Sequence, residues 1–214
     1  MKHKQAWNKG VDPWNKGLVV GPKKHLEPSH VQQIGKKLKE FGRVRDLALF
    51  RLGIDTMLPG HELVKMKIDD VVRGEYIRAD YEVKHPTKDN ATFRIPLSKV
   101  TQKAVYNWLD VMDEAEDVWL FPGRGRRDGE RYMTARQYAR LCNQWFMMIG
   151  LDPADYGTHS IRRCRAMQAY NASNGNVFVP QICLGHVKPE TTMAYLGLLQ
   201  QDADIERILK QVTV

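Results

Sequence analysis

The sequence has few cysteines and no long apolar run. Its three cysteines are odd in number and far apart, at Cys142, Cys164 and Cys183, and no Cys-x-x-Cys pair occurs. This spacing indicates neither a disulfide framework nor a zinc site, and favours thiols in a reducing compartment. No apolar stretch reaches the ~18 residues of a membrane helix, and the first ten residues lack a secretory signal. We therefore expect a cytoplasmic protein with no membrane partner.

Acidic residues are in the minority, and the imbalance is local. Residues 1–45 hold 11 basic and 3 acidic side chains, whereas residues 46–214 hold 22 of each. A basic arm on a balanced body favours a polyanionic partner, because neutralised phosphates release condensed counterions. The alternative is a tail that serves only solubility. The residues expected to contact DNA are Lys23, Lys24, Lys36, Lys37, Arg43 and Arg45.

What is present suffices for a folded core, since 43% of the residues are hydrophobic, which excludes wholesale disorder. Helical periodicity predicts helices over residues 29–41, 43–57, 98–112 and 134–149, and short helices separated by glycines in the last third. Residues 76–83 and 91–95 read as a β-hairpin, and residues 118–122 as a short strand before an arginine-rich loop at 123–127. The predicted fold class is mainly α with a small antiparallel hairpin (α+β). We expect a weakly ordered basic arm at 1–28 and one domain at 29–214.

Four polar residues in the last third form a set with a chemical use. His159 and Arg162 lie three apart after a plausible N-cap, Thr158, and so share one helix face. His186 follows a glycine that lets the chain turn, and Tyr195 lies nine residues further on. A tyrosine hydroxyl can attack a phosphodiester once its proton is removed. A fixed guanidinium and imidazoles can stabilise the resulting charge without metal.

Three stretches of the sequence resemble motifs of the tyrosine recombinases, the phage-integrase family. They are Gly157-Thr158-His159-Ser160-Ile161-Arg162-Arg163, Leu184-Gly185-His186, and the run TTMAYLG at 191–197. Residues 45–58 and 62–71 resemble the first conserved block of that catalytic domain, so the resemblance covers nearly the whole chain from about Lys23. It is greatest to short bacterial integrase-like proteins.

The resemblance implies cleavage and rejoining of DNA through a 3′-phosphotyrosyl intermediate, with no cofactor and no metal. Tyr195 matches the nucleophile, Arg162 the second phosphate-binding arginine, His159 the proton-handling residue and His186 the histidine that orients the phosphate. The implied partner is double-stranded DNA in the bacterial nucleoid, bound by a homo-oligomer, either a dimer or a tetramer. A helix expected at about 202–212 is a candidate for assembly, or for packing on its own core.

Two positions depart from the family pattern. The first catalytic arginine should precede Glu62 by three residues, where this chain has Pro59, which carries neither charge nor donor. His61 is a weak substitute. The general-acid lysine should lie on the hairpin immediately before a threonine, where this chain has Pro86.

Lys84 and Lys88 flank the position of the missing lysine, and either could supply the acid. Three readings therefore stay open from the sequence: an active recombinase, a degenerate recombinase that binds DNA as a regulatory or architectural protein, and an unrelated helical protein. The order and spacing of the motifs argue against the third. We lean towards the first.

Overall fold

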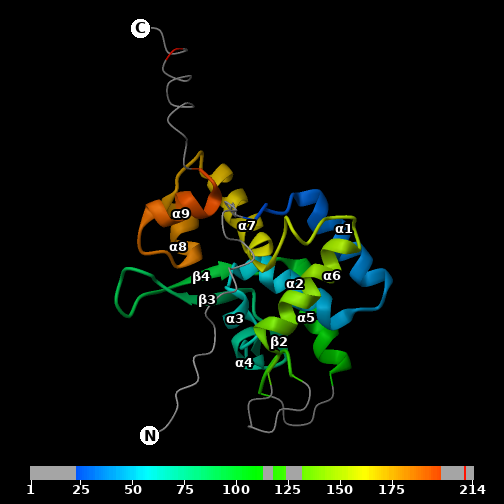
Figure 1. Cartoon of the computed structure of the whole chain (residues 1–214). Helices are drawn as coiled ribbons and strands as arrows, with labels where there is room; N and C mark the ends of the chain where they lie inside the picture. The colour runs from blue at the N-terminus through cyan, green and yellow to red at the C-terminus, as the bar shows by residue number, and fades with distance from the viewer. Residues whose placement is uncertain (1–22, 113–117, 124–131, 199–209, 211–214) are drawn as a thin grey trace, which may run out of the picture.

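The computed structural model describes residues 23–112, 118–123, 132–198 and residue 210. Its larger part is a group of five helices, shown in Figure 1. They are α1 (Pro28–Glu40), α2 (Val44–Thr56), α5 (Lys99–Val111), α6 (Ala135–Met147) and α7 (Thr158–Ala172). Helix α2 packs against α1, α5 and α7, and is therefore the central element.

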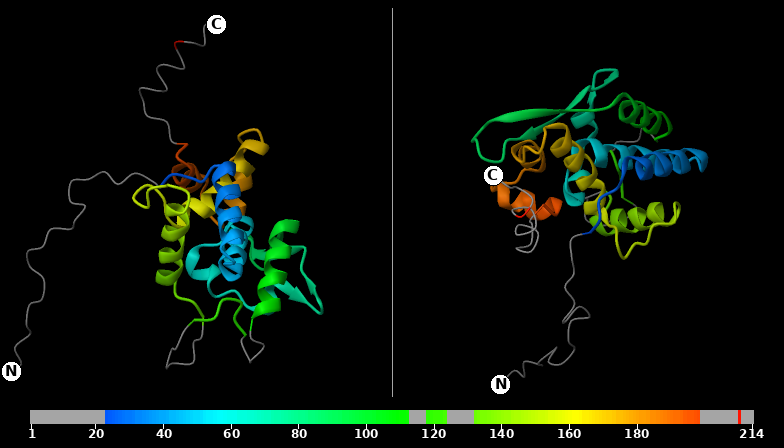
Figure 2. Two further views of the ribbon diagram at one scale, coloured as in Figure 1. Left: turned by 90° about the vertical axis from the view of Figure 1, so that its right-hand side faces the viewer. Right: turned by 90° about the horizontal axis from the view of Figure 1, so that it is seen from above.

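Shorter elements complete the fold around this group. After α2 come the single turns α3 (Gly60–Leu63) and α4 (Ile68–Val71), then the small antiparallel pair β1 (Val72–Arg73) and β2 (Tyr76–Ile77). The longer hairpin pairs β3 (Asp80–Lys84) with β4 (Thr92–Pro96), with Tyr81 opposite Ile95. Helices α8 (Phe178–Leu184) and α9 (Pro189–Leu196) follow α7. Seen from above, the hairpin runs beside α8 and α9 (Figure 2).

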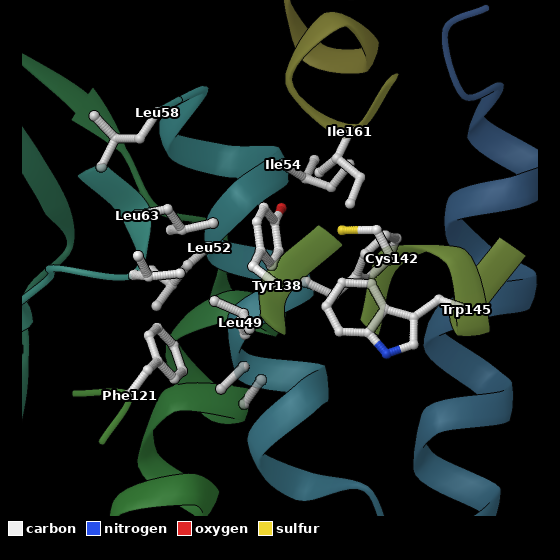
Figure 3. Close-up of a cluster of buried hydrophobic side chains, with 14 of the residues drawn as sticks. Leu49, Leu52, Ile54, Leu58, Leu63, Phe121, Tyr138, Cys142, Trp145 and Ile161 are labelled. Atoms are coloured by element: carbon white, nitrogen blue, oxygen red, sulfur yellow. The ribbon is translucent and has the colours of Figure 1, made fainter. Parts of the chain in front are cut away.

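The main core lies where α2 meets its neighbours. Leu49 and Leu52 on α2 are fully buried and face the aromatic rings of Tyr138 and Trp145 from α6 (Figure 3). Large aromatic and branched side chains contribute about 1.5–3 kcal/mol each when buried. The same helix carries two buried carboxylates, Asp46 and Asp55, and Asp46 accepts a hydrogen bond from the indole nitrogen of Trp145 at 3.4 Å.

A smaller core joins the hairpin to the last two helices. Its buried members are Met57, Ile95, Ala166, Leu184 and Leu196, which come from the end of α2, β4, α7, α8 and α9. Tyr195 packs partly against this second core. The cluster therefore fixes α9, and with it Tyr195, relative to α7.

The predicted fold class is confirmed, and the four predicted long helices occur at nearly their predicted bounds. Two strand predictions are wrong in detail. Residues 118–122 form only isolated bridges, at Trp119 and at Pro122, because Pro122 has no N–H to extend a ladder. The strand predicted at 76–83 is divided, since the Arg78 N–H bonds the Val71 carbonyl instead of β4. Its first residues pair with β1 instead.

Some predictions fall outside the described residues. These are most of the basic arm, the arginines at 124–127 and the C-terminal helix apart from residue 210. Within the described part of the chain, all three cysteines are free, and no helix is long and apolar enough to cross a membrane.

Candidate active site

Tyr195 lies in the last turn of α9 and faces the first turn of α7. Its hydroxyl is 3.4 Å from Nδ1 of His159 and 3.3 Å from the His159 backbone carbonyl, to which it can donate. The two rings meet edge to face, with centroids 5.9 Å apart. Gly197, at φ 75°, caps the end of α9 two residues after Tyr195. The phenol is therefore held beside an imidazole that can take its proton.

Arg162 lies one turn after His159 on α7, as their spacing predicts. Its guanidinium donates to the backbone carbonyls of Met57 and Leu184, at the C-terminal ends of α2 and α8. Met57 has a left-handed backbone with φ 53°, which is uncommon for a residue with a side chain. The guanidinium carbon of Arg162 is 5.8 Å from the centroid of the Tyr195 ring. Three segments thus converge on one cation beside the phenol.

His186 reaches the site from the other side of Tyr195. Gly185 ends α8 in the left-handed region with φ 71°, which lets the chain reverse as the sequence predicts. The Nδ1 atom of His186 lies 3.0 Å from the hydroxyl of Thr192, a buried residue of α9. Its ring centroid is 5.4 Å from that of Tyr195. The four residues predicted from the sequence therefore come together around one phenol.

The electrostatics of the site keep the imidazoles neutral and the phenol protonated. Loss of water around the ring, and then the charges of Arg162 and Arg163, lower the pKa of His159 below 6.5. Desolvation and then Arg162 lower the pKa of His186. Burial raises the pKa of Tyr195 above 10.0, although both arginines act in the opposite direction. At neutral pH the phenol carries its proton, and His159 is a neutral acceptor.

Arg162 also lines a cleft of about 450 Å³ between the hairpin and the end of α8. Pro59, Glu62, Lys84 and Pro86 line the same cleft. Both positions where the family pattern is broken therefore line the same cleft as Arg162. Lys84 is the lysine of the hairpin that reaches this space.

The other two candidates for replacing the missing groups lie elsewhere. Lys88 is exposed at the hairpin turn and does not line the cleft. The side chain of His61 is 70% exposed and lies 3.6 Å from the carboxylate of Glu62. Neither residue contacts Arg162 or Tyr195 in the described structure.

The basic residues predicted to bind DNA have partners within the chain. Arg43 and Arg45 both bind the buried carboxylate of Asp46, with Arg45 at 3.1 Å. Lys36 and Lys37 lie 3.8 and 3.1 Å from one glutamate in the last turn of α1. The lysine and arginine side chains of these pairs stay partly exposed to solvent. The pairs therefore do not prevent those side chains from contacting phosphate. Their role in DNA binding stays a prediction.

A comparison with known protein families now bears on the chain. The model described as "Phage integrase family" matches residues 24–202, which include every residue of the site described above. The chain belongs to the phage integrase family. Among curated relatives, tyrosine recombinase XerC of Corynebacterium glutamicum is 30% identical over 158 residues. That match covers 71% of this chain and 46% of the relative, so the chain spans about half the length of that recombinase.

Solved structures of integrase-family proteins share the fold. XerA recombinase superimposes with a TM-score of 0.64 at 19% identity, covering 89% of this chain and 63% of its own. The XerH site-specific recombinase bound to palindromic difH substrate superimposes with a TM-score of 0.63 at 17% sequence identity. That match covers 87% of this chain and 52% of the XerH chain. The Tn1549 transposon integrase in complex with transposon right end DNA superimposes with a TM-score of 0.60 at 16% sequence identity. That match covers 90% of this chain and 67% of the integrase chain. The described domain therefore has the fold of tyrosine recombinase catalytic domains.

Sequence reasoning missed two partners in this integrase-family site. Thr192 lies within hydrogen-bond distance of His186, and it is only three residues before Tyr195 in the sequence. Arg163 is nearer to the Tyr195 ring than Arg162 is, with its guanidinium carbon 4.8 Å from the centroid. Its position next to Arg162 was the available signal, but adjacent residues on a helix point in different directions. Both guanidinium groups nevertheless lie near the Tyr195 ring, at 5.8 Å for Arg162 and 4.8 Å for Arg163.

Proposed function

We propose that this chain cleaves and rejoins double-stranded DNA through a covalent bond between Tyr195 and a DNA 3′-phosphate. The observation that carries the proposal is the placement of the Tyr195 hydroxyl 3.4 Å from His159, with the Arg162 guanidinium beside the same ring. Membership of the phage integrase family supports it. The XerH and Tn1549 integrase structures hold DNA, which supports double-stranded DNA as the partner.

In this reaction the Tyr195 oxygen attacks phosphorus and the bond to the DNA 5′-oxygen breaks. His159 takes the phenol proton, while Arg162 and His186 bind the non-bridging oxygens, where negative charge grows. The departing 5′-oxygen takes a proton from Lys84, the ammonium that lines the cleft, or from water. Rejoining is the reverse, with a 5′-hydroxyl attacking the phosphotyrosine. No energy source is consumed, because one phosphodiester is exchanged for another.

The test is covalent trapping on a nicked suicide duplex, in which the short 5′-ended fragment diffuses away after cleavage. Candidate sites are inverted repeats in the DNA that flanks the coding sequence. Denaturing gels should show a protein–DNA adduct with the intact chain and none with Tyr195→Phe. Tyr170→Phe is the matched control, since Tyr170 lies on α7 against the same small core but away from His159. Adduct formation by Tyr195→Phe would contradict the assignment.

A second candidate is a DNA-binding regulatory or architectural protein that does not cut. It is favoured by Pro59 and Pro86, which line the cleft where the family pattern expects a guanidinium and an ammonium. Losing one preorganised donor typically costs about 10²–10³ in rate, and losing a general acid about 10²–10⁴. Binding without adduct, on a site occupied at equilibrium, would favour this candidate.

Assembly on DNA as a dimer or tetramer is part of the proposal. It is supported by the lambda integrase dimer bound to a core site, a fold relative with a TM-score of 0.56 at 14% identity that covers 82% of this chain and 48% of its own. Gel-shift stoichiometry with a chain ended after Gln201 tests whether residues 202–214 are needed. Unchanged assembly by that chain would contradict a role for them between protomers.

A further inference from the structure

Arg163 is a buried cation that the reaction above does not use. Only 6% of the residue is exposed, and its guanidinium lies over the Tyr195 ring at 4.8 Å. Its Nη1 atom donates to the backbone carbonyl of Lys23, and its Nε atom is buried with no hydrogen-bond partner in the described structure. A buried guanidinium with so few acceptors depends strongly on the one it has.

The carbonyl that holds Arg163 belongs to a strap, residues 23–27, that crosses the start of α7. The Lys24 N–H donates to the Asp155 carbonyl at 3.0 Å, and the Lys24 ammonium pairs with the Asp155 carboxylate at 2.7 Å. Leu26 is buried in the main core, and its N–H reaches the Ser160 carbonyl at 3.4 Å. The strap is therefore anchored on both sides of the point where α7 begins.

We infer that Arg163 is a positioning residue for Tyr195, and that the strap holds Arg163 in place. The chain of contacts runs from the Lys24–Asp155 pair to the Lys23 carbonyl, to the Arg163 guanidinium and to the face of the Tyr195 ring. Displacing the strap removes the acceptor of a buried cation, so Arg163 must move to find water or another acceptor. The phenol that it supports then shifts relative to His159.

This arrangement links the basic N-terminus to the nucleophile. Residues 1–22 carry four lysines and lead directly into the strap. DNA bound by those residues would act on Tyr195 through the Lys23 carbonyl. This consequence rests on the proposed function, whereas the positioning of Tyr195 does not.

The experiment follows Tyr195 itself, in the free protein, by NMR of chain labelled with ¹³C at the tyrosine Cζ. Tyr195→Phe identifies its resonance among the eight tyrosines. Arg163→Met should shift this resonance and raise the pKa of Tyr195, since one of the cations that oppose its rise is gone. The charged groups that face the ring are Arg162 and Arg163, and the other titratable groups that face it are His159 and His186. Arg163→Lys keeps the positive charge, so it should move the Tyr195 resonance less than Arg163→Met does.

Lys24→Glu tests the strap without touching the site, because the Lys24 side chain is 63% exposed. Lys24→Glu should move the Tyr195 resonance in the same direction as Arg163→Met. The double variant Lys24→Glu/Asp155→Lys restores the ion pair with its charges exchanged, so it should return the resonance to its position in the intact protein. Two controls match these changes. Arg165→Lys alters a neighbouring α7 arginine that also binds backbone carbonyls, and Lys99→Glu makes the same charge change on α5. Both should leave the resonance in place.

An unmoved Tyr195 resonance in folded Arg163→Met would overturn the role of Arg163. If Arg163→Met does not fold, Arg163→Lys and Lys24→Glu carry the test. A resonance that moves with Arg163→Met but not with Lys24→Glu would overturn the role of the strap.

On a cleavable duplex, Arg163→Met should lower phosphotyrosyl formation about 10- to 100-fold, as expected for a nucleophile displaced by about 1 Å. If the intact chain forms no adduct at all, the proposed function fails while the NMR result still decides the positioning role.

Discussion

Pro59 and Arg162 line the same cleft, one from the start of α3 and the other from α7. The family pattern expects its first catalytic arginine at position 59, where this chain has proline. Glu62, the acid expected to hold that arginine, lines the cleft as well. This arrangement supports the alignment of Pro59 with the catalytic position and makes the role of each group open to direct test.

The rate of adduct formation should fall as the pH drops through the pKa of His159. That pKa lies below 6.5, and only the neutral imidazole can take the phenol proton. The rate should therefore stay high at neutral pH and decline only once the pH falls below the ordinary imidazole pKa of about 6.5. Single-turnover trapping between about pH 5 and pH 8 measures it, with DNA binding followed over the same range. A rate that increases on acidification would exclude His159 as the acceptor.

Asp46 should contribute to stability more than surface carboxylates do. It is 3% exposed, accepts hydrogen bonds from Trp145 and Arg45, and forms an ion pair with Arg43. Asp46→Ala leaves the buried indole N–H without its acceptor, while the partly exposed arginines regain water. We expect the free energy of unfolding in urea to fall by about 1–3 kcal/mol.

Glu40→Ala is the matched control for Asp46→Ala. Glu40 also faces two basic side chains, Lys36 and Lys37, but on the surface of α1. Its loss should change the free energy of unfolding by less than about 1 kcal/mol. Equal effects of Asp46→Ala and Glu40→Ala would mean that the burial of Asp46 does not increase its contribution to the free energy of unfolding.

The sequence was informative where local rules decide the structure. Helical periodicity located α1, α2, α5 and α6, and glycine at position 185 predicted the turn that presents His186. The four residues Tyr195, Arg162, His159 and His186 were found because their order and spacing resemble a family. Their convergence is a matter of tertiary packing, which the spacing alone does not determine.

The features that were missed depend on contacts between distant segments. The carbonyl of Met57 that binds Arg162 exists because α2 ends in a left-handed turn, which no local signal at Met57 indicates. Arg163 binds the Lys23 carbonyl from the other end of the chain. Every residue has a backbone carbonyl, so residue types do not indicate which carbonyl accepts a given hydrogen bond. The sequence therefore could not predict these two contacts.

The basic arm should set the salt dependence of DNA binding. A truncation should stop before the strap, because Leu26 is 1% exposed and belongs to the core. Removing residues 1–22 deletes four lysines. The slope of log affinity against log salt should flatten by up to ~0.9 for each lost phosphate contact. Filter binding across a salt series measures this slope, and substitution of the four lysines by glutamine is the control for chain length.

An unchanged slope after truncation at residue 22 would exclude the arm as a phosphate-binding element. The phosphate contacts would then come from other basic residues, such as Arg43 and Arg45, which stay partly exposed in their pairs with Asp46. A flatter slope with the truncated chain but not with the glutamine variant would assign the effect to length instead of charge.

Restoring side chains at Pro59 and Pro86 should act on chemistry and little on binding. Pro59→Arg returns a bidentate phosphate donor to a turn followed by Glu62, and Pro86→Lys returns an ammonium to the hairpin. Each new side chain enters a cleft of about 450 Å³ that Arg162 already lines. We expect the double variant to raise phosphotyrosyl formation at least about 10²-fold. DNA affinity should change far less, because residues 1–45, which carry the whole excess of positive charge, are unchanged.

The single variants then separate the two roles. If Lys84 already protonates the leaving 5′-oxygen, Pro59→Arg alone gives most of the gain, and Lys84→Met removes it. If Lys84 does not act, Pro86→Lys contributes a gain of its own that Lys84→Met leaves intact. Tyr195→Phe in the double variant must abolish the adduct, which shows that any gain runs through the same nucleophile.

No gain on a duplex that the protein binds would mean that positions 59 and 86 are not the catalytic positions. Because both prolines line the cleft with Arg162, that outcome would also count against the cleft as the place where phosphate is held.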